Sequence, residues 1–388
     1  MKKIANLLVF LVLILSCSKT EDNTIIRNIE QGVQQGDSNE NEGPDNSAGN
    51  PDTNGANLDD ITTGFESLMN VYGIPGAQVA ITRFNKIIYL ESFGTADLEN
   101  SKEVDDNSVF RIASISKPIT LTAISKLVAE GTLHLDDFIF GEGSLLGTQY
   151  GDLPYDDLEE SITLDHLIEH MGGFTDDPID IMFDDNSLTQ SELISKVLDE
   201  RSLTHVPGTQ YAYSNFGYSL LGRIIEEATG MTYEDYIKEA ILAPMNISNM
   251  HIAGNTKQDA YENEVTYYSG WRDPYAMNVS RMDSHGGWIA STKELALYAM
   301  HSDLEASVPD LLGPDEGLSY LKRGNWNHNG ALPGSLTVLQ VEYPISYVVL
   351  TNSGNSNFQE VIQAIRNYFN EKIENRQDWP NNDVIDDL

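Results

Sequence analysis

The amino-acid sequence predicts an α+β fold, in which an antiparallel β-sheet is flanked by helices and carries a mainly helical inserted subdomain. Two observations support this prediction. Runs rich in β-branched and aromatic residues occur near both ends of the 388-residue chain, whereas the long stretch between them has apolar residues at helical spacing. This distribution is typical of one sheet that takes strands from both chain ends and is interrupted by helices.

The predicted sheet begins with a hairpin and is completed near the C-terminus. Residues 78–84 and 87–93 have the composition of strands and are separated by a two-residue turn. Residues 335–342 and 347–352 indicate two further strands, and residues 360–373 have helical spacing. We therefore expect the C-terminal strands to complete the sheet that the hairpin begins.

Helices are predicted within the insertion and directly before it. The third helix of the insertion is the best defined, because Asn215 is a good N-cap, an apolar stripe follows and Gly230 stops it. Pro118 is tolerated only in a first helical turn, so the helix that carries Lys117 should begin close to Ser114. The predicted helices of the insertion span residues 165–170, 189–198, 216–228 and 232–242.

The N-terminus is typical of an exported protein. Lys2 and Lys3 precede an apolar run from residue 4 to residue 15, which is too short for a stable transmembrane helix. Cys17 closes this run and is the only cysteine, so an internal disulfide is excluded. Residues 14–17 resemble the lipobox of bacterial lipoproteins, and residues 18–22 resemble an outer-face export tag. These resemblances imply lipidation at Cys17 and anchoring to a bacterial outer membrane, on its periplasmic or cell-surface face.

Four segments are therefore expected. Residues 1–17 form the signal peptide, 18–60 a disordered acidic tether, 61–374 the folded domain and 375–388 an acidic tail. The formal net charge is −37, and acidic residues are spread through all segments after the signal. Such a surface repels phosphate backbones, so we expect no nucleic-acid partner.

Two alternative chemistries were weighed against the leading candidate. Residues 166–170 match the inverted zinc-protease motif H-x-x-E-H, but the match is short, and we expect His166 and His170 to pack against or cap their helix instead. The α/β-hydrolase arrangement needs a G-x-S-x-G elbow, which occurs nowhere in the chain. We therefore predict no metal and no cofactor.

The leading candidate is the S-x-x-K pattern that joins Ser114 to Lys117. A serine three residues ahead of a lysine shares its helix face, so the amine can take the proton of the hydroxyl and activate it for acyl transfer. The same pattern also occurs at residues 16–19 and 319–322, and its surroundings must therefore decide between the three matches.

Two further motifs follow Ser114 in order. Residues 213–215 match Y-x-N, residues 328–330 match H-x-G, and residues 207–222 form a longer and more specific segment around Tyr213. With these motifs the chain resembles the penicillin-recognising serine hydrolases, particularly the class C β-lactamase-like branch with its esterases and D-amino-acid peptidases. The resemblance covers about residues 60 to 370.

The resemblance implies a role for each matching residue. Ser114 would be the nucleophile that forms an acyl-enzyme, while Lys117 and Tyr213 would act as general bases. Asn215 would orient Lys117 or a substrate amide, and His328 would face the site from an edge strand. The backbone N–H groups of Ser114 and Ala331, the latter directly after Gly330, would hold the oxyanion.

The third motif departs from the K-T-G form of the family. His328 replaces the lysine and Asn329 replaces the hydroxyl residue, so the carboxylate of a β-lactam would be held less firmly. We therefore expect a small-molecule ester or a D-amino-acid peptide or amide as substrate. Two alternatives stay open, namely a β-lactamase and a penicillin-binding or sensor-type module without efficient turnover.

Overall fold

The computed structural model describes residues 57–176, 179–183 and 185–387. The predicted signal peptide, Cys17 and residues 18–56 of the predicted tether lie outside the described residues. Within the described ranges, no helix combines the length and the apolar character that crossing a membrane requires.

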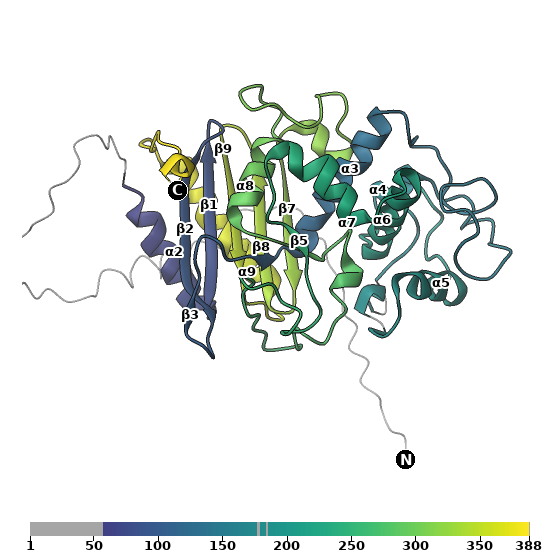
Figure 1. Cartoon of the computed structure of the whole chain (residues 1–388), viewed down its shortest axis with the longest axis horizontal. Coiled ribbons are helices and arrows are strands. Elements are labelled where there is room, and N and C mark those ends of the chain that lie inside the picture. The colour runs from purple at the N-terminus through teal and green to yellow at the C-terminus, as the bar shows by residue number, and fades with distance from the viewer. Residues whose placement is uncertain (1–56, 177–178, 184, 388) are drawn as a thin grey trace, which may run out of the picture. The chain divides into compact units, whose positions relative to one another are not determined.

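One six-stranded antiparallel sheet forms the centre of the domain, in the order β3-β2-β1-β9-β8-β7 (Figure 1). β1 and β2 form the predicted hairpin, and β1 also pairs with β9, with Ala77 opposite Thr351. The two chain ends therefore meet in the middle of the sheet, which confirms the predicted fold class. The strands are β1 Gly76–Arg83, β2 Ile87–Asp97, β3 Lys102–Glu103, β7 Trp326–Leu332, β8 Ser335–Val341 and β9 Ile345–Thr351.

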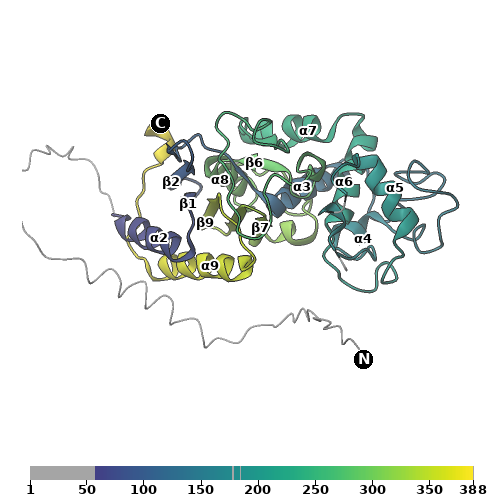
Figure 2. The same ribbon diagram turned by 90° about the horizontal axis from the view of Figure 1, so that it is seen from below.

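Two helices cover one face of the sheet. α2 (Asp59–Tyr72) and α9 (Phe358–Asn375) lie side by side there (Figure 2), and the rings of Phe65 and Phe369 approach to 5.5 Å between centroids. Both helices bury one apolar stripe, as expected of helices with one face in water. Trp379, in the segment predicted to be an acidic tail, is buried in this same core.

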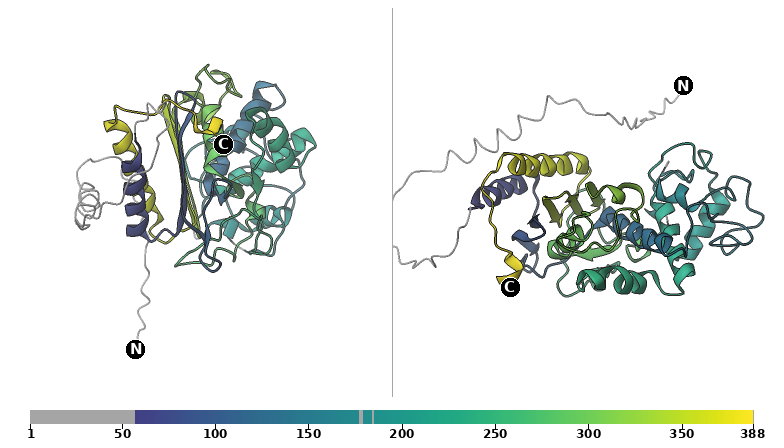
Figure 3. Two further views of the ribbon diagram at one scale, coloured as in Figure 1. Left: turned by 60° about the vertical axis from the view of Figure 1, so that its left-hand side comes forward. Right: turned by 90° about the horizontal axis from the view of Figure 1, so that it is seen from above.

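The opposite face of the sheet carries the larger core and all other helices (Figure 3). α3 (Ser116–Ala129) is buried on almost every side, because it lies between the sheet and the helical insertion. The other helices are α4 Leu164–Ile168, α5 Gln190–Glu200, α6 Asn215–Thr229, α7 Tyr233–Tyr236, a π-helical continuation Ile237–Leu242, and α8 Thr292–Met300. A second, three-stranded sheet has the order β4-β6-β5 and comprises β4 Phe110–Arg111, β5 His251–Ile252 and β6 Trp288–Ala290.

One predicted detail of the insertion is wrong. Asn215 was expected to cap α6, but the cap is Ser214, whose hydroxyl accepts a hydrogen bond from the backbone N–H of Gly217 at 3.0 Å. Both residue types are good N-caps, and the sequence alone does not separate neighbours. Since Ser214 fills this role, the amide of Asn215 is available for other contacts.

Candidate active site

Ser114 lies on a tight turn at the entrance to α3. A single 3₁₀ turn, Ala113–Ile115, leads directly into the α-helix, and Pro118 occupies its first turn as the sequence predicted. Ala113 has φ of 50°, a left-handed conformation that is uncommon for a residue with a side chain. Strain of this kind persists only where surrounding contacts impose it, and it is frequent at functional sites.

Lys117 lies one turn below Ser114 and is completely buried. Its Nζ is 3.3 Å from Ser114 Oγ, 2.6 Å from Asn215 Oδ1 and 2.8 Å from the carbonyl oxygen of His285. Burial lowers the pKa of Lys117 to about 7, against the opposing effect of the Asp180 and Asp176 carboxylates. A substantial fraction of this amine is therefore neutral at neutral pH.

Tyr213 approaches the same hydroxyl from the other side. Its phenol donates a hydrogen bond to Ser114 Oγ at 3.0 Å, and its ring lies 4.8 Å from Lys117 Nζ. Burial raises the pKa of Tyr213 well above its ordinary value, so the phenol keeps its proton at neutral pH. In the resting site Tyr213 is therefore a hydrogen-bond donor to Ser114.

Asn215 connects Lys117 to a carboxylate. Its side-chain Oδ1 accepts from Lys117 Nζ, while its Nδ2 donates to Asp180 Oδ2 at 2.6 Å. Because a carboxylate can only accept hydrogen bonds and an ammonium can only donate them, these two neighbours determine that the amide oxygen faces Lys117 and the amide nitrogen faces Asp180. Sequence reasoning missed Asp180, which lies in a loop with no periodic pattern.

The third motif lies on β7, the edge strand that passes against the Ser114 turn. A Cβ on Gly330 would clash with the carbonyl oxygen of Ile112 and would lie 2.9 Å from Ala113 Cβ. Only glycine allows the strand to come this close. Gly330 and Ala331 consequently line the same cavity as Ser114, where the resemblance expects the second oxyanion donor.

His328 also lines the cavity but carries no charge at neutral pH. Burial, together with the nearby charge of Lys117, lowers the pKa of His328 to about 4. The neighbouring Asn329 presents its Oδ1 to Arg366 Nε of α9 at 2.8 Å, and Arg366 also donates to Asn327 Oδ1 at 2.8 Å. Sequence reasoning missed Arg366, because its partners on β7 are almost 40 residues away.

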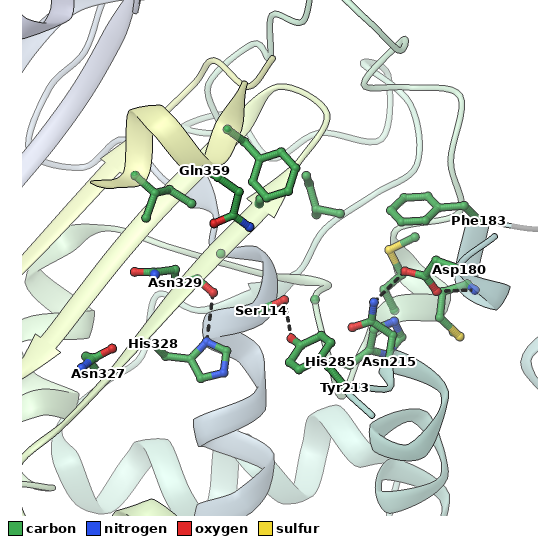
Figure 4. A pocket seen from close by; sticks show the side chains of 18 residues that line it. Ser114, Asp180, Phe183, Tyr213, Asn215, His285, Asn327, His328, Asn329 and Gln359 are labelled. Atoms are coloured by element: carbon green, nitrogen blue, oxygen red, sulfur yellow. Dashed lines mark hydrogen bonds between the residues drawn. The ribbon is translucent and has the colours of Figure 1, made fainter. Parts of the chain in front are cut away.

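The residues of the three motifs face one cavity of about 550 Å³ (Figure 4). Ser114 lies near its centre, between His328 and Asn329 on one side and Asn215 and Asp180 on the other. Its large apolar lining residues are Met182, Phe183, Met282, Leu332, Phe358 and Ile362. All the predicted site residues that the structure describes line this cavity except Lys117, which lies beneath the cavity floor and contacts Ser114 and Asn215.

The two histidines of the H-x-x-E-H match have local structural contacts. His166 Nδ1 accepts from the backbone N–H of Thr163 at 3.2 Å and completes a capping box at the start of α4. His170 Nδ1 accepts from the backbone N–H of Ser214 at 3.1 Å, and its ring stacks on Tyr218. No group of three or more metal-ligating side chains that could hold an ion occurs among the described residues.

The fold and the arrangement of the three motifs define a class of protein, those with a β-lactamase-type domain. The chain belongs to the Beta-lactamase family, which matches residues 61–368. Among curated relatives, Protein flp from Staphylococcus aureus (strain COL) is 30% identical over 233 residues, 56% of this chain and 45% of the relative. Penicillin-binding protein 4* from Bacillus subtilis (strain 168) is 30% identical over 196 residues, 50% of this chain and 41% of the relative. The chain thus spans less than half the length of these relatives.

Solved structures show the same fold at low sequence identity. A class C β-lactamase superposes with a TM-score of 0.62 at 18% identity, covering 80% of this chain and 95% of the other. The D-amino acid amidase from Ochrobactrum anthropi SV3 gives 0.63 at 19% identity, with coverage of 81% and 98%. The octameric penicillin-binding protein homologue from Pyrococcus abyssi gives 0.63 at 23%, with coverage of 80% and 76%.

Proposed function

We propose that this protein hydrolyses an ester or a D-amino-acid amide or peptide through an acyl-enzyme on Ser114. One observation carries the proposal, namely the three partners of Lys117 Nζ. A neutral amine has two N–H bonds and one lone pair. Two of its partners are carbonyl oxygens, which can only accept, so the lone pair is left for the hydroxyl of Ser114.

The reaction follows from this arrangement in two halves. Ser114 Oγ attacks the substrate carbonyl and gives its proton to Lys117, while the backbone N–H groups of Ser114 and Ala331 stabilise the oxyanion. The leaving group departs with a proton from the phenol of Tyr213, which Lys117 then reprotonates. A water molecule next attacks the acyl carbon, passing its proton through Tyr213 and Lys117, and Ser114 regains its hydrogen as the acid leaves.

The charges around the cavity favour esters and amides over β-lactams. Neither a lysine nor an arginine is among the described residues that line it, and His328 is neutral. A β-lactam substrate carries a carboxylate that gains most from a permanent cation. The relatives and neighbours named above include penicillin-binding, β-lactamase and amidase proteins. The test therefore includes a β-lactam and an amide beside the ester.

The test compares labelling with turnover. The domain is incubated with a serine-directed fluorophosphonate, and hydrolysis of a chromogenic short-chain ester, a D-amino-acid amide and a chromogenic cephalosporin is followed. We expect labelling at Ser114 and turnover of the ester or the amide, both lost in Ser114→Ala and kept in Ser319→Ala. Labelling without turnover of any substrate would favour a sensor-type module. Turnover that survives in Ser114→Ala would contradict the proposal.

We also propose that Cys17 is lipidated and anchors the protein to a bacterial outer membrane. The support comes from the sequence, where the apolar run ends at the only cysteine. When the full chain is expressed in a Gram-negative host grown with an alkyne-tagged fatty acid, we expect the protein to be labelled and to be found in the membrane fraction. Cys17→Ser should abolish the label and release the protein from the membrane fraction. An unlabelled wild-type chain would contradict this proposal.

A further inference from the structure

The cavity beside Ser114 has a charge that the proposed reaction does not use. Asp180 is the only carboxylate among the described residues that line it. Asp180 lies immediately before the 3₁₀ turn Ile181–Phe183 and faces the cavity next to Asn215 (Figure 4). A cavity with one acid and no basic side chain on its surface attracts cations and repels anions.

Asp180 retains capacity to accept from a ligand. Its Oδ1 accepts from the backbone N–H of Met182 at 3.0 Å, and its Oδ2 accepts from Asn215 Nδ2 at 2.6 Å. A carboxylate offers about four acceptor positions, so about two are still available. The adjacent Met182 and Phe183 are apolar, and a charged hydrogen bond formed beside them is weakly screened.

Asp180 is also close to the reacting atoms. Three contacts of 3.3, 2.6 and 2.6 Å lead from Ser114 Oγ through Lys117 and Asn215 to Asp180 Oδ2. Asp180 and the β7 residues lie on opposite sides of Ser114. A substrate whose carbonyl is attacked by Ser114 therefore has one substituent directed toward β7 and another toward Asp180.

We propose that the site selects acyl donors with a primary ammonium group close to the scissile carbonyl, and that Asp180 binds this ammonium. Aminoacyl esters, aminoacyl amides and peptides with a free N-terminus have this chemistry. This inference rests on the function proposed above and specifies its substrate class. The alternative is that Asp180 acts only as a positioning residue, which orients the amide of Asn215.

The test varies the charge of the substrate and the charge of Asp180 together. The substrates are the benzyl esters of alanine and of lactic acid, each as both enantiomers, because a hydroxyl replaces the ammonium at nearly constant shape. Released benzyl alcohol is measured for the wild type, for Asp180→Asn and for Asp176→Asn. Asp176 influences Lys117 electrostatically but is not part of the cavity lining, so it is the matched control.

We expect the wild type to prefer the alanine ester, and Asp180→Asn to reduce this preference in kcat/KM by about tenfold or more, as for loss of a charged hydrogen bond. Asp176→Asn should keep the preference within about threefold, since Asp176 is not among the residues that line the cavity. Dividing the preference of a variant by the preference of the wild type cancels the different intrinsic reactivity of the two esters. It also cancels any effect of Asp180 on Asn215.

Several results would overturn the inference. If Asp180→Asn slows both esters by the same factor, Asp180 only positions Asn215. If the wild type shows no preference for the alanine ester over the lactate ester, the site does not select an ammonium, and this result needs no variant to fold. Hydrolysis of the lactate ester through Ser114 would at the same time support the proposed function. If neither ester is hydrolysed and Ser114 is not labelled, the proposed function fails first.

Discussion

Two segments of this chain share the S-x-x-K pattern but lie in different surroundings. Ser114 and Ser319 both lie in short 3₁₀ turns, and both turns include a residue with φ of 50°. Lys117 is completely buried and contacts three polar groups, whereas Lys322 is exposed to solvent. Local backbone shape therefore does not distinguish the two segments, whereas the burial of the lysine does.

The difference between the two lysines is one of solvation. Lys322 is exposed to water, whereas the side chain of Lys117 has no contact with bulk solvent. Burial disfavours the charged form of Lys117, and the carbonyl oxygens of Asn215 and His285 orient its amine. For the proposed function, the surrounding fold rather than the tetrapeptide therefore makes Lys117 suitable as a base.

The largest expected effect comes from exchanging either lysine for methionine. Lys117→Met removes the base, and kcat/KM for a chromogenic ester should fall about 10³-fold. Lys322→Met should leave it within about twofold of the wild type, because an exposed side chain away from the cavity is removed. Equal losses in both variants would show that the comparison between the two segments is wrong.

The second effect concerns the phenol that contacts Ser114. Tyr213→Phe removes the donor at 3.0 Å from Ser114 Oγ, and kcat should fall about 10²-fold, since proton transfer to the leaving group is lost. Tyr320→Phe is the control, because the buried hydroxyl of this partly buried tyrosine has no hydrogen-bond partner among the described residues. A loss in Tyr320→Phe as large as in Tyr213→Phe would indicate a general packing effect.

Gly330→Ala tests the strand that lies against Ser114. The new Cβ would lie 2.9 Å from Ala113 Cβ, and we expect the free energy of unfolding to fall by about 2 kcal/mol, as for overpacked sites. Gly217→Ala is the control, because its Cβ would lie 3.7 Å from the nearest atom, Ser214 Oγ. Urea denaturation of both variants measures the difference. An unchanged midpoint in Gly330→Ala would contradict the close packing of β7.

The last effect is a pH dependence that follows from the burial of Lys117. Protonated Lys117 has no lone pair, so kcat/KM should rise with pH through about 7 and fall about tenfold per pH unit below it. The low-pH part of the kcat/KM profile, which reports on the free enzyme, is measured with an ester that has no ionisable group. A flat profile between pH 5 and pH 9 would mean that Lys117 is not the base.

Sequence reasoning succeeded where a physical pattern is repeated along the chain. The hairpin, the C-terminal strands and α9 have clear periodicity, and the resemblance placed Ser114, Tyr213 and His328 around one site. Asp180 was missed because a single acid in an aperiodic loop carries no signal. The three-stranded sheet was missed because its strands have only two or three residues each, too few for an alternating pattern.

The order of the strands has a consequence for how the protein is made. β1 precedes Ser114 in the chain, but its partner β9 and the edge strand β7 follow Ser114 by more than 200 residues. Ser114 and Lys117 are therefore synthesised long before the wall of their site exists. A chain that stops before β7 carries Ser114 without the strand that packs against it, so the proposed activity requires synthesis to continue beyond β7.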